Sequence, residues 1–481
     1  LTMNIFTSKE CRESNSSCPV AVFVHGGSAL YSGPLNFPDE SLVTNFGKQG
    51  IVLVTFAYRL GVFGVMALGD ENVLPANLAM HDIVEALRFT QREIHNFGGD
   101  KNQVTLMGHS TGATIVVTMV FSPAVNKPSE IPLFTRAIGM SSSTVYESES
   151  KQVSRSHVVA KHLGCEGTAQ EILDCMMRLS TDEIIKGATQ VGGPNEFSPS
   201  HLAGITTSGE LMPIHNTDEL RKNQKAHMDG LEQPTKLLLG TMWNEFRFDD
   251  ARIDTALQKV NGDITQVMDI LGVLNPEECA KRYYDDMKLG KFNPSYDTLS
   301  QAMFVTTSLF AQSQARTGAE VYLYQWDYTK HSQHADDLYY FMGMKKDPLD
   351  QDEKWLSRVY PLYFTNFIRG LPLAPDWTPL DPELMNYYSI NKSFSNDDEP
   401  RMRMAYHHDL TDYYKAVAKF DEKVTITKKM LFNAPVAYKN LAVHSGDQEP
   451  FNLRDLLFYG TLVGVMVFIF WKVYECYRTF R

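Results

Sequence analysis

The stretch VTLMGHSTG, residues 104–112, decides the fold of this chain. It begins with a short apolar run and leads into a second one, Ala113 to Phe121. This pattern predicts a strand, a very tight turn and a helix, with Ser110 at the turn in a strained backbone conformation. Gly108 and Gly112 are needed there because a Cβ at either position would collide with the neighbouring strand or helix. The alternative interpretation is an ordinary tight turn in which the serine caps the helix.

Apolar runs of strand length alternate with helical patterns over roughly the first half of the chain. This alternation predicts an α/β fold with a central, mostly parallel sheet flanked by helices. The segment Leu78 to Phe97 has apolar residues at helical spacing. The expected strands lie within Leu1–Phe6, Val20–Val24, Ile51–Ala57, Val104–Met107, Ala137–Met140, Leu237–Leu239 and Val321–Trp326.

The bulk composition excludes one class of partner. The 481 residues carry a net charge of −12, and no basic stretch offsets it, which argues against a nucleic-acid partner. The acidity fits a solvated surface, or it favours cationic ligands. With 43% hydrophobic and 21% charged residues, the chain is typical of a globular protein and long enough to bury a large core.

Cysteines and glycosylation sequons indicate an oxidising compartment. Two cysteine pairs are each close enough in sequence to close a small loop, namely Cys11 with Cys18 and Cys165 with Cys175. Two sequons begin at Asn15 and Asn391, and they would be glycosylated only in a secretory lumen. Together these features favour disulfide bonds and a glycoprotein.

An uncharged run of 16 residues, LLFYGTLVGVMVFIFW, occupies positions 456–471. It is slightly shorter than the usual ~17–25 residues of a membrane span, but Lys472 can snorkel and extend the helix to residue 474. Apolar residues on all faces and aromatics at both ends favour a single membrane span over a buried core helix. Basic residues then place the tail, 475–481, in the cytosol and the rest on the lumenal or extracellular side. Gly460 and Gly464 are spaced for close helix pairing, which is compatible with a homodimer.

The large domain is expected to cover residues 1–440, followed by a polar stalk, 441–455. Residue 1 is Leu rather than Met, and no signal peptide is visible. Because a strand already begins in the first residues, we expect that an upstream part is missing.

A serine hydroxyl is a weak nucleophile, so it needs a base and donors for an oxyanion. In open α/β sheets such groups gather at the carboxyl ends of strands. Gly26 and Gly27 directly follow the expected strand at Val20–Val24, and their N–H groups together with that of Thr111 would form an oxyanion hole. An ordinary glycine turn is the alternative.

Glu245 follows the expected strand at Leu237–Leu239, and His334 follows the one at Val321–Trp326. The order serine, acid, histidine is the order of a hydrolase with this architecture. The choice stays open at this point: His331 and His109 compete with His334, and Asp249 and Asp250 compete with Glu245. The histidines show no metal-ligand spacing, so neither a metal nor a cofactor is expected.

From Leu1 to about Tyr414 the chain resembles the type-B carboxylesterase/cholinesterase family, which has the α/β-hydrolase fold. The resemblance is carried by VFVHGG (22–27), YRLGVFG (58–64), FGGD (97–100), VTLMGHSTG (104–112), HADDLYY (334–340) and WTP (377–379), in this order. It implies a serine esterase that acts on small ester substrates. Ser110 would be the nucleophile, His334 the general base and Glu245 the acid that orients it. Gly26, Gly27 and Thr111 would supply the oxyanion donors, and Cys165 with Cys175 would match a family disulfide.

Three positions depart from the family pattern. Thr111 replaces the usual Ala after the serine, Phe246 replaces the usual Gly after the acid, and Ser28 replaces a third glycine. Thr111 contributes a backbone N–H and should be tolerated, whereas Phe246 could shift Glu245 or shrink the acyl pocket. The family also includes adhesion proteins with an inactive site and one C-terminal span, which is the alternative function.

A cholinesterase in the strict sense is a further alternative, because the upstream part would hold the choline site. His109, where cholinesterases usually have Glu, favours a general esterase.

Overall fold

A computed structural model describes residues 2–13, 17–122, 124–125, 131–142, 146–147, 149–192, 205–206, 234–246, 268, 273–292, 296–344 and 348–433. The chain divides into two compact units, Leu1–Asp421 and Glu422–Arg481. The first unit contains the sheet and the predicted catalytic residues. Helix α15 (His408–Asn433) begins in this unit.

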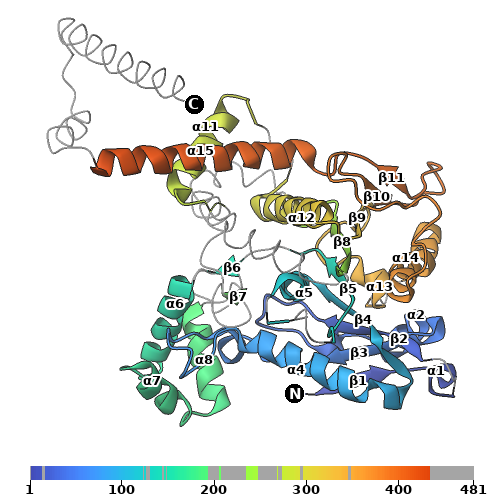
Figure 1. The fold of residues 1–481 in the computed structure, drawn as a ribbon, viewed down its shortest axis with the longest axis horizontal. Helices are drawn as coiled ribbons and strands as arrows, with labels where there is room; N and C mark the ends of the chain where they lie inside the picture. The colour runs from blue at the N-terminus through green and yellow to red at the C-terminus, as the bar shows by residue number, and fades with distance from the viewer. Residues whose placement is uncertain are drawn as a thin grey trace, which may run out of the picture. The chain divides into compact units, whose positions relative to one another are not determined.

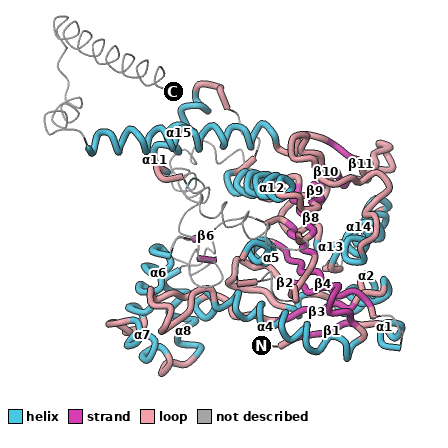
Figure 2. The backbone as a smooth tube through the Cα atoms, viewed as in Figure 1, coloured by secondary structure: helices cyan, strands magenta, loops and turns pink. Residues whose placement is uncertain are grey.

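Nine strands of the described residues form one sheet, with the order β1-β3-β2-β4-β5-β8-β9-β10-β11 (Figures 1 and 2). The strands from β3 to β10 pair in parallel, and β1 and β11 are antiparallel edge strands. The bounds are β1 (Met3–Phe6), β2 (Cys18–Val24), β3 (Val52–Phe56), β4 (Gly99–His109), β5 (Arg136–Met140), β8 (Lys236–Met242), β9 (Val321–Trp326), β10 (Tyr387–Ile390) and β11 (Arg401–Arg403). The expected α/β fold with a mostly parallel sheet is confirmed.

Alternate residues of each strand pack into two cores on opposite faces of the sheet. In β2, Val20, Val22 and Val24 face one core, which also contains residues of α4 (Leu78–Glu93), α5 (Thr111–Phe121) and α12 (Thr298–Arg316). Ala21 and Phe23 face the other core, with α2 (Asp39–Asn45), α13 (Leu338–Phe341) and α14 (Gln351–Arg369). Figure 1 shows these two sets of helices on the two sides of the sheet. Burial on both faces explains why the parallel strands are continuous apolar runs in the sequence.

Smaller elements surround this sheet. Helices α3 (Val62–Val65), α6 (Glu149–His162), α7 (Ala169–Met176) and α8 (Thr181–Gly192) share a third core. Helices α11 (Pro276–Lys288), α12 and α15 share a fourth. The other described elements include α1 (Lys9–Glu13), three short 3-10 helices and a pair of two-residue strands, β6 (Tyr146–Glu147) and β7 (Ile205–Thr206).

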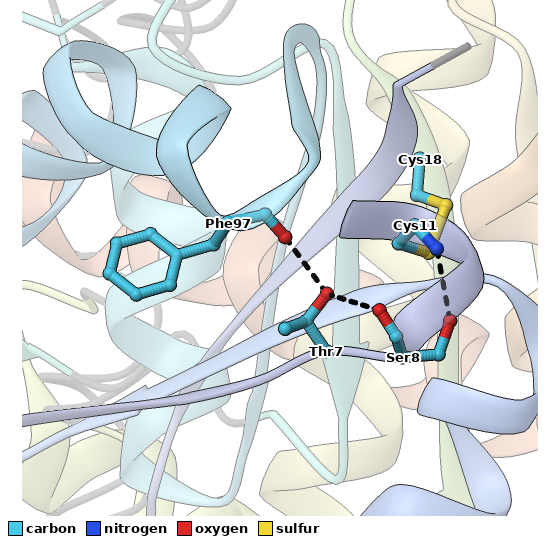
Figure 3. The surroundings of a disulfide bond; sticks show 5 residues. All are labelled: Thr7, Ser8, Cys11, Cys18 and Phe97. Carbon is cyan, nitrogen blue, oxygen red and sulfur yellow. Dashed lines mark hydrogen bonds between the residues drawn. A yellow bond between two sulfur atoms is a disulfide. The ribbon is translucent and has the colours of Figure 1, made fainter. Parts of the chain in front are cut away.

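Both predicted cysteine pairs form disulfides, with Cα–Cα distances of 5.6 Å for Cys11–Cys18 and 5.5 Å for Cys165–Cys175. The first joins α1 to the start of β2 (Figure 3). There the Cys11 N–H donates to the Ser8 hydroxyl at 3.2 Å.

The C-terminal predictions fall outside the described residues. These are the stalk at 441–455, the membrane span at 456–474 and the tail at 475–481. Within the part of the chain that the structure describes, no helix is both long enough and apolar enough to cross a membrane. The sequon residue Asn15 also lies outside the described residues, whereas Asn391 directly follows β10.

Candidate active site

Ser110 lies between the end of β4 and the start of α5, in a segment that we call the nucleophile turn (residues 108–112). Its φ of 56° is in the region that side chains rarely adopt, and its N–H donates to the Met140 carbonyl at 2.9 Å. A Cβ on Gly108 would lie 2.5 Å from the Gly112 oxygen, and one on Gly112 would lie 2.2 Å from the Val24 oxygen. The strand, tight turn and helix predicted around these two glycines are therefore present.

His334 links Ser110 to Glu245. Its Nε2 lies 2.8 Å from the Ser110 Oγ, and its Nδ1 lies 2.7 Å from a Glu245 carboxylate oxygen. Glu245 is fully buried, and its other carboxylate oxygen accepts the Met242 N–H at 2.8 Å. The His334 N–H also donates to the Glu245 carbonyl at 2.7 Å, so two hydrogen bonds join these residues. The structure thus brings together three residues that are up to 224 positions apart.

This arrangement fixes the tautomer of the histidine. A buried carboxylate can only accept a hydrogen bond, so Nδ1 carries the proton that Glu245 accepts. Nε2 is then left with a lone pair that faces the Ser110 hydroxyl. That is the state in which an imidazole can remove a proton from serine.

His334 lies in the loop between β9 and α13, which we call the base loop (residues 327–337). Glu353 of α14 anchors this loop although it is fully buried. Its carboxylate lies 2.9 Å from the Lys330 Nζ and 3.0 Å from the His331 Nε2, and it accepts a hydrogen bond from the Tyr340 hydroxyl at 3.1 Å. His331, one of the competing histidines, therefore contacts Glu353 rather than Ser110.

The structure also bears on the other candidates for the base and the acid. His109 is buried beside the site, with its ring centroid 4.9 Å from that of His334. Burial, and to a lesser degree the charge of a protonated His334, lower the pKa of His109 well below its usual value, so its imidazole is neutral. Asp249 and Asp250 lie outside the described residues.

The glycine pair after β2 lies against the nucleophile turn. A Cβ on Gly26 would be 2.8 Å from the Ser110 Cβ, so only glycine permits this approach. Gly27 has a φ of 107°, and a Cβ there would lie 2.2 Å from the Tyr31 oxygen. Thr111, the third predicted donor, is the first residue of α5. Gly26 and Thr111 therefore lie directly beside Ser110, and Gly27 follows Gly26 in the chain.

Phe246 does not displace the acid. Its ring stacks on the His334 imidazole, with centroids 5.1 Å apart and an angle of 22° between the planes. The Phe246 N–H donates to the Ser300 hydroxyl at 2.9 Å, which holds the segment after Glu245 against α12. The larger side chain thus packs along the histidine while Glu245 keeps its short hydrogen bond to Nδ1.

Sequence reasoning missed Asp337, which lies three positions after His334. It is fully buried, and it accepts a hydrogen bond from the Tyr360 hydroxyl at 2.9 Å. Burial raises the pKa of Asp337 to about 7, and the negative charge of Glu245 adds to this effect. Asp337 lies within the motif HADDLYY (334–340), but its position in an Asp-Asp pair resembles a solvated loop and gave no sign of its burial.

No group of three or more His, Cys, Asp or Glu residues that could hold a metal ion occurs among the described residues.

A mostly parallel sheet, a serine on a strained strand-to-helix turn, and an acid and a histidine after later strands define the α/β-hydrolase fold. The chain belongs to the carboxylesterase family, whose model matches residues 1–408.

Relatives and solved structures agree with this assignment. The chain is 26% identical over 424 residues to carboxylesterase 1D of Rattus norvegicus, covering 78% of this chain and 71% of that protein. It is 29% identical over 420 residues to acylcarnitine hydrolase of Rattus norvegicus, covering 79% and 69%. A solved structure of a PNB esterase superposes with a TM-score of 0.66 at 20% identity, covering 85% of this chain and 83% of that one, which supports the fold.

Proposed function

We propose that this protein hydrolyses carboxylic esters through an acyl-enzyme intermediate on Ser110. Membership of the carboxylesterase family supports ester hydrolysis as the reaction. The observation that carries the proposed mechanism is the continuous hydrogen-bonded series from Ser110 through His334 to the buried carboxylate of Glu245. Such a series is what a serine needs in order to act as a nucleophile at neutral pH.

In the first half of the reaction, the Ser110 Oγ attacks the ester carbonyl while its proton moves to the His334 Nε2. The imidazolium that forms is stabilised by Glu245, to which it already donates through Nδ1. The negative charge on the carbonyl oxygen is held by the N–H groups of Gly26, Gly27 and Thr111. When the intermediate collapses, the C–O bond to the alcohol breaks, and the alcohol leaves with the proton from Nε2.

In the second half, water replaces the alcohol. His334 removes a proton from the water molecule as its oxygen attacks the acyl carbonyl. Collapse of this second intermediate breaks the bond to the Ser110 Oγ, which recovers the proton from Nε2. The products are an alcohol and a carboxylic acid, and the site returns to its starting state without any cofactor.

Thr111 fits this mechanism despite its difference from the family pattern. Its proposed contribution is a backbone N–H, which any residue other than proline supplies. Its side chain adds bulk next to the nucleophile, which we expect to restrict the size of the group that binds there.

The test is labelling of the protein with a fluorophosphonate probe, which reacts with an activated serine. We expect the wild type to label and the Ser110→Ala and His334→Ala variants not to label. His331→Ala is the matched control, because His331 contacts Glu353 and should leave labelling intact. A folded wild-type protein that never labels would overturn the mechanism.

A catalytically inactive adhesion protein is not favoured. Such a role would not require a serine, an imidazole and a carboxylate within hydrogen-bond distance of one another, and Phe246 packs beside the imidazole without breaking that series. A fluorophosphonate-negative protein that binds another cell surface would reverse this preference.

We also propose that residues 456–474 anchor the chain in a membrane, with the catalytic unit on the lumenal or extracellular side. The uncharged run at 456–471 and the two disulfides support this placement. Glycans at Asn15 and Asn391 and dimerisation through the anchor belong to the same proposal. Retention in membranes after alkaline carbonate extraction, lost when the chain ends at residue 440, is the expected result. Release of the full chain by carbonate would contradict it.

A further inference from the structure

A polar cavity of about 310 Å³ lies beside the last three strands of the sheet. Its volume is in the range of binding sites for small molecules. It is lined by Trp243, Tyr296, Gln325, Asp327, Tyr387, Asn391, Arg403 and His407. None of these residues belongs to the proposed serine mechanism, so the cavity needs a separate explanation.

The sheet register gathers these side chains. Ser389 of β10 pairs with Gln325 of β9, and Tyr387 pairs with Arg403 of β11. Side chains at paired positions point to the same face of a sheet. Residues from three strands therefore line the same cavity, although they are up to 78 positions apart, from 325 to 403.

Opposite charges line the cavity without contacting each other. The Asp327 carboxylate accepts a hydrogen bond from the Ser389 hydroxyl. Burial raises the pKa of Asp327 to about 6, which still leaves it mostly ionised at neutral pH. Arg403 makes no ion pair with any described carboxylate, whereas its neighbour Arg401 lies 2.9 Å from Asp398. The cavity thus offers one anionic and one cationic group.

Two further polar side chains line the cavity. Gln325 is only 5% exposed, and its side chain lines the cavity. The Nε2 of His407 is buried without a partner in the described part of the chain. Burial lowers the pKa of His407 to about 3, so this ring is neutral. Because buried polar groups are normally satisfied, this unpartnered Nε2 indicates a cavity that receives a polar ligand.

Aromatic rings complete the walls. Trp243, Tyr296 and Tyr387 all line the cavity, and the Trp243 side chain is 41% exposed. Aromatic faces together with a carboxylate are a favourable environment for an ammonium group. Arg403 supplies the bidentate donors that a carboxylate group prefers.

We propose that this cavity binds a small zwitterion, with its ammonium group between Asp327 and the aromatic rings and its carboxylate on Arg403. The Gln325 amide hydrogen-bonds to the bound molecule. A ligand of this class neutralises both charges of the cavity. A polyol of the same size would form hydrogen bonds in the cavity but would contribute no charge to Asp327 or Arg403.

The experiment is a calorimetric titration of the full chain in the Ser110→Ala background, so that ester chemistry plays no part. A glycan at Asn391, which lines the cavity, would exclude the ligand, so the two proposals apply to different forms of the protein. Protein from a bacterial host with an oxidising compartment is used, because Asn391 then carries no glycan. The probes are trimethylglycine and its longer homologue γ-trimethylaminobutyrate. Tetramethylammonium, butyrate and glucose serve as cation-only, anion-only and uncharged controls. Trp243 fluorescence provides a second readout.

We expect saturable binding of at least one zwitterion, with each control binding at least ~10-fold more weakly. Asp327→Asn and Arg403→Gln should each weaken zwitterion binding by ~10-fold or more. Arg401→Gln is the matched control on the same strand and should leave the affinity unchanged. Melting temperatures verify that each variant is folded.

Three outcomes would overturn the proposal. They are the absence of saturation in the millimolar range, binding of glucose as tightly as the zwitterions, and an affinity that both charge-removing variants leave unchanged. Because the Ser110→Ala background is used, none of these outcomes depends on the esterase mechanism.

Discussion

The nucleophile turn and the base loop hold the two reacting side chains by different physical means. In the nucleophile turn, close backbone approaches at Gly26, Gly108 and Gly112 leave the chain a single path past Ser110. The base loop is instead positioned by side chains from distant elements, since Glu245 and Glu353 both contact it. The glycines of the nucleophile turn can be recognised in the sequence, whereas the side-chain contacts of the base loop form only when the chain has folded.

From this comparison we expect the largest loss of activity when a carboxylate that contacts the base loop from a distant element is replaced. Glu245→Gln should lower kcat about 1,000–10,000-fold with little change in KM, because the amide can donate to Nδ1 and stabilise the wrong tautomer. Steady-state kinetics on a simple aryl ester measures this. Glu320→Gln is the control, because Glu320 pairs with Lys236 before the start of β9, at the opposite end of that strand from the base loop. A loss smaller than about tenfold would show that the carboxylate is not needed for orientation.

The nucleophile turn should instead be sensitive to a single methyl group. Gly26→Ala places a Cβ 2.8 Å from both the Ser110 Cβ and the His109 oxygen. The displaced backbone should lose an oxyanion donor, and kcat should fall about 100–1,000-fold. Gly33→Ala is the control, because Gly33 is extended and a Cβ there would meet nothing within 4 Å. Equal activity in the two variants would refute the steric argument.

Anchoring of the base loop should have a smaller, graded effect. Glu353→Gln removes the buried carboxylate that contacts Lys330 and His331, although Lys330 keeps its contact with Asp350, and we expect kcat to fall about tenfold while KM is retained. Tyr340→Phe removes only one hydrogen-bond donor to Glu353 and should lower kcat less than Glu353→Gln does. Kinetics and fluorophosphonate labelling rates measure both variants. If Glu353→Gln melts earlier but labels at the wild-type rate, Glu353 only stabilises the fold.

Replacement of Asp337 should change the pH dependence of stability more than it changes activity. The pKa of an unfolded Asp is about 3.9, whereas in the folded protein that of Asp337 is about 7. Between these values the folded chain holds a proton that the unfolded chain has lost, so this group makes stability fall as pH rises from ~4 to ~7. Asp337→Asn removes this contribution. The melting temperature of the variant, relative to wild type, should therefore increase over that interval, and parallel curves would contradict the assignment.

The difference between the two regions explains what the sequence could predict. Strands β2, β4 and β9 were predicted because burial on both faces makes them continuous apolar runs. Strands β10 (YYSI) and β11 (RMR) were missed, because their sequences contain no run of aliphatic residues. The nucleophile turn was found from its own residues, because its two glycines, its serine and the flanking apolar runs form a recognisable pattern, although some of its close contacts are with the segment after β2.

The catalytic histidine of the base loop could not be identified from the sequence in the same way. His331 and His334 are three residues apart and equally suited to act as a base on sequence position alone. Which of them meets Ser110 depends on where Glu245 and Glu353 lie after folding. The raised pKa of Asp337 and the polar cavity are likewise tertiary properties, and no local pattern indicates them.

The two ends of the sheet have a consequence for solubility. An exposed strand edge is a template for pairing with another chain, and long flat edges promote aggregation. Here β1 spans only four residues and β11 only three. In β11 the side chains of Arg401, which pairs with Asp398, and Arg403 flank Met402. A second molecule that approached edge to edge would meet the same side chains. We therefore expect the sheet to resist growth by strand addition, which would protect the chain from aggregation at high protein concentration.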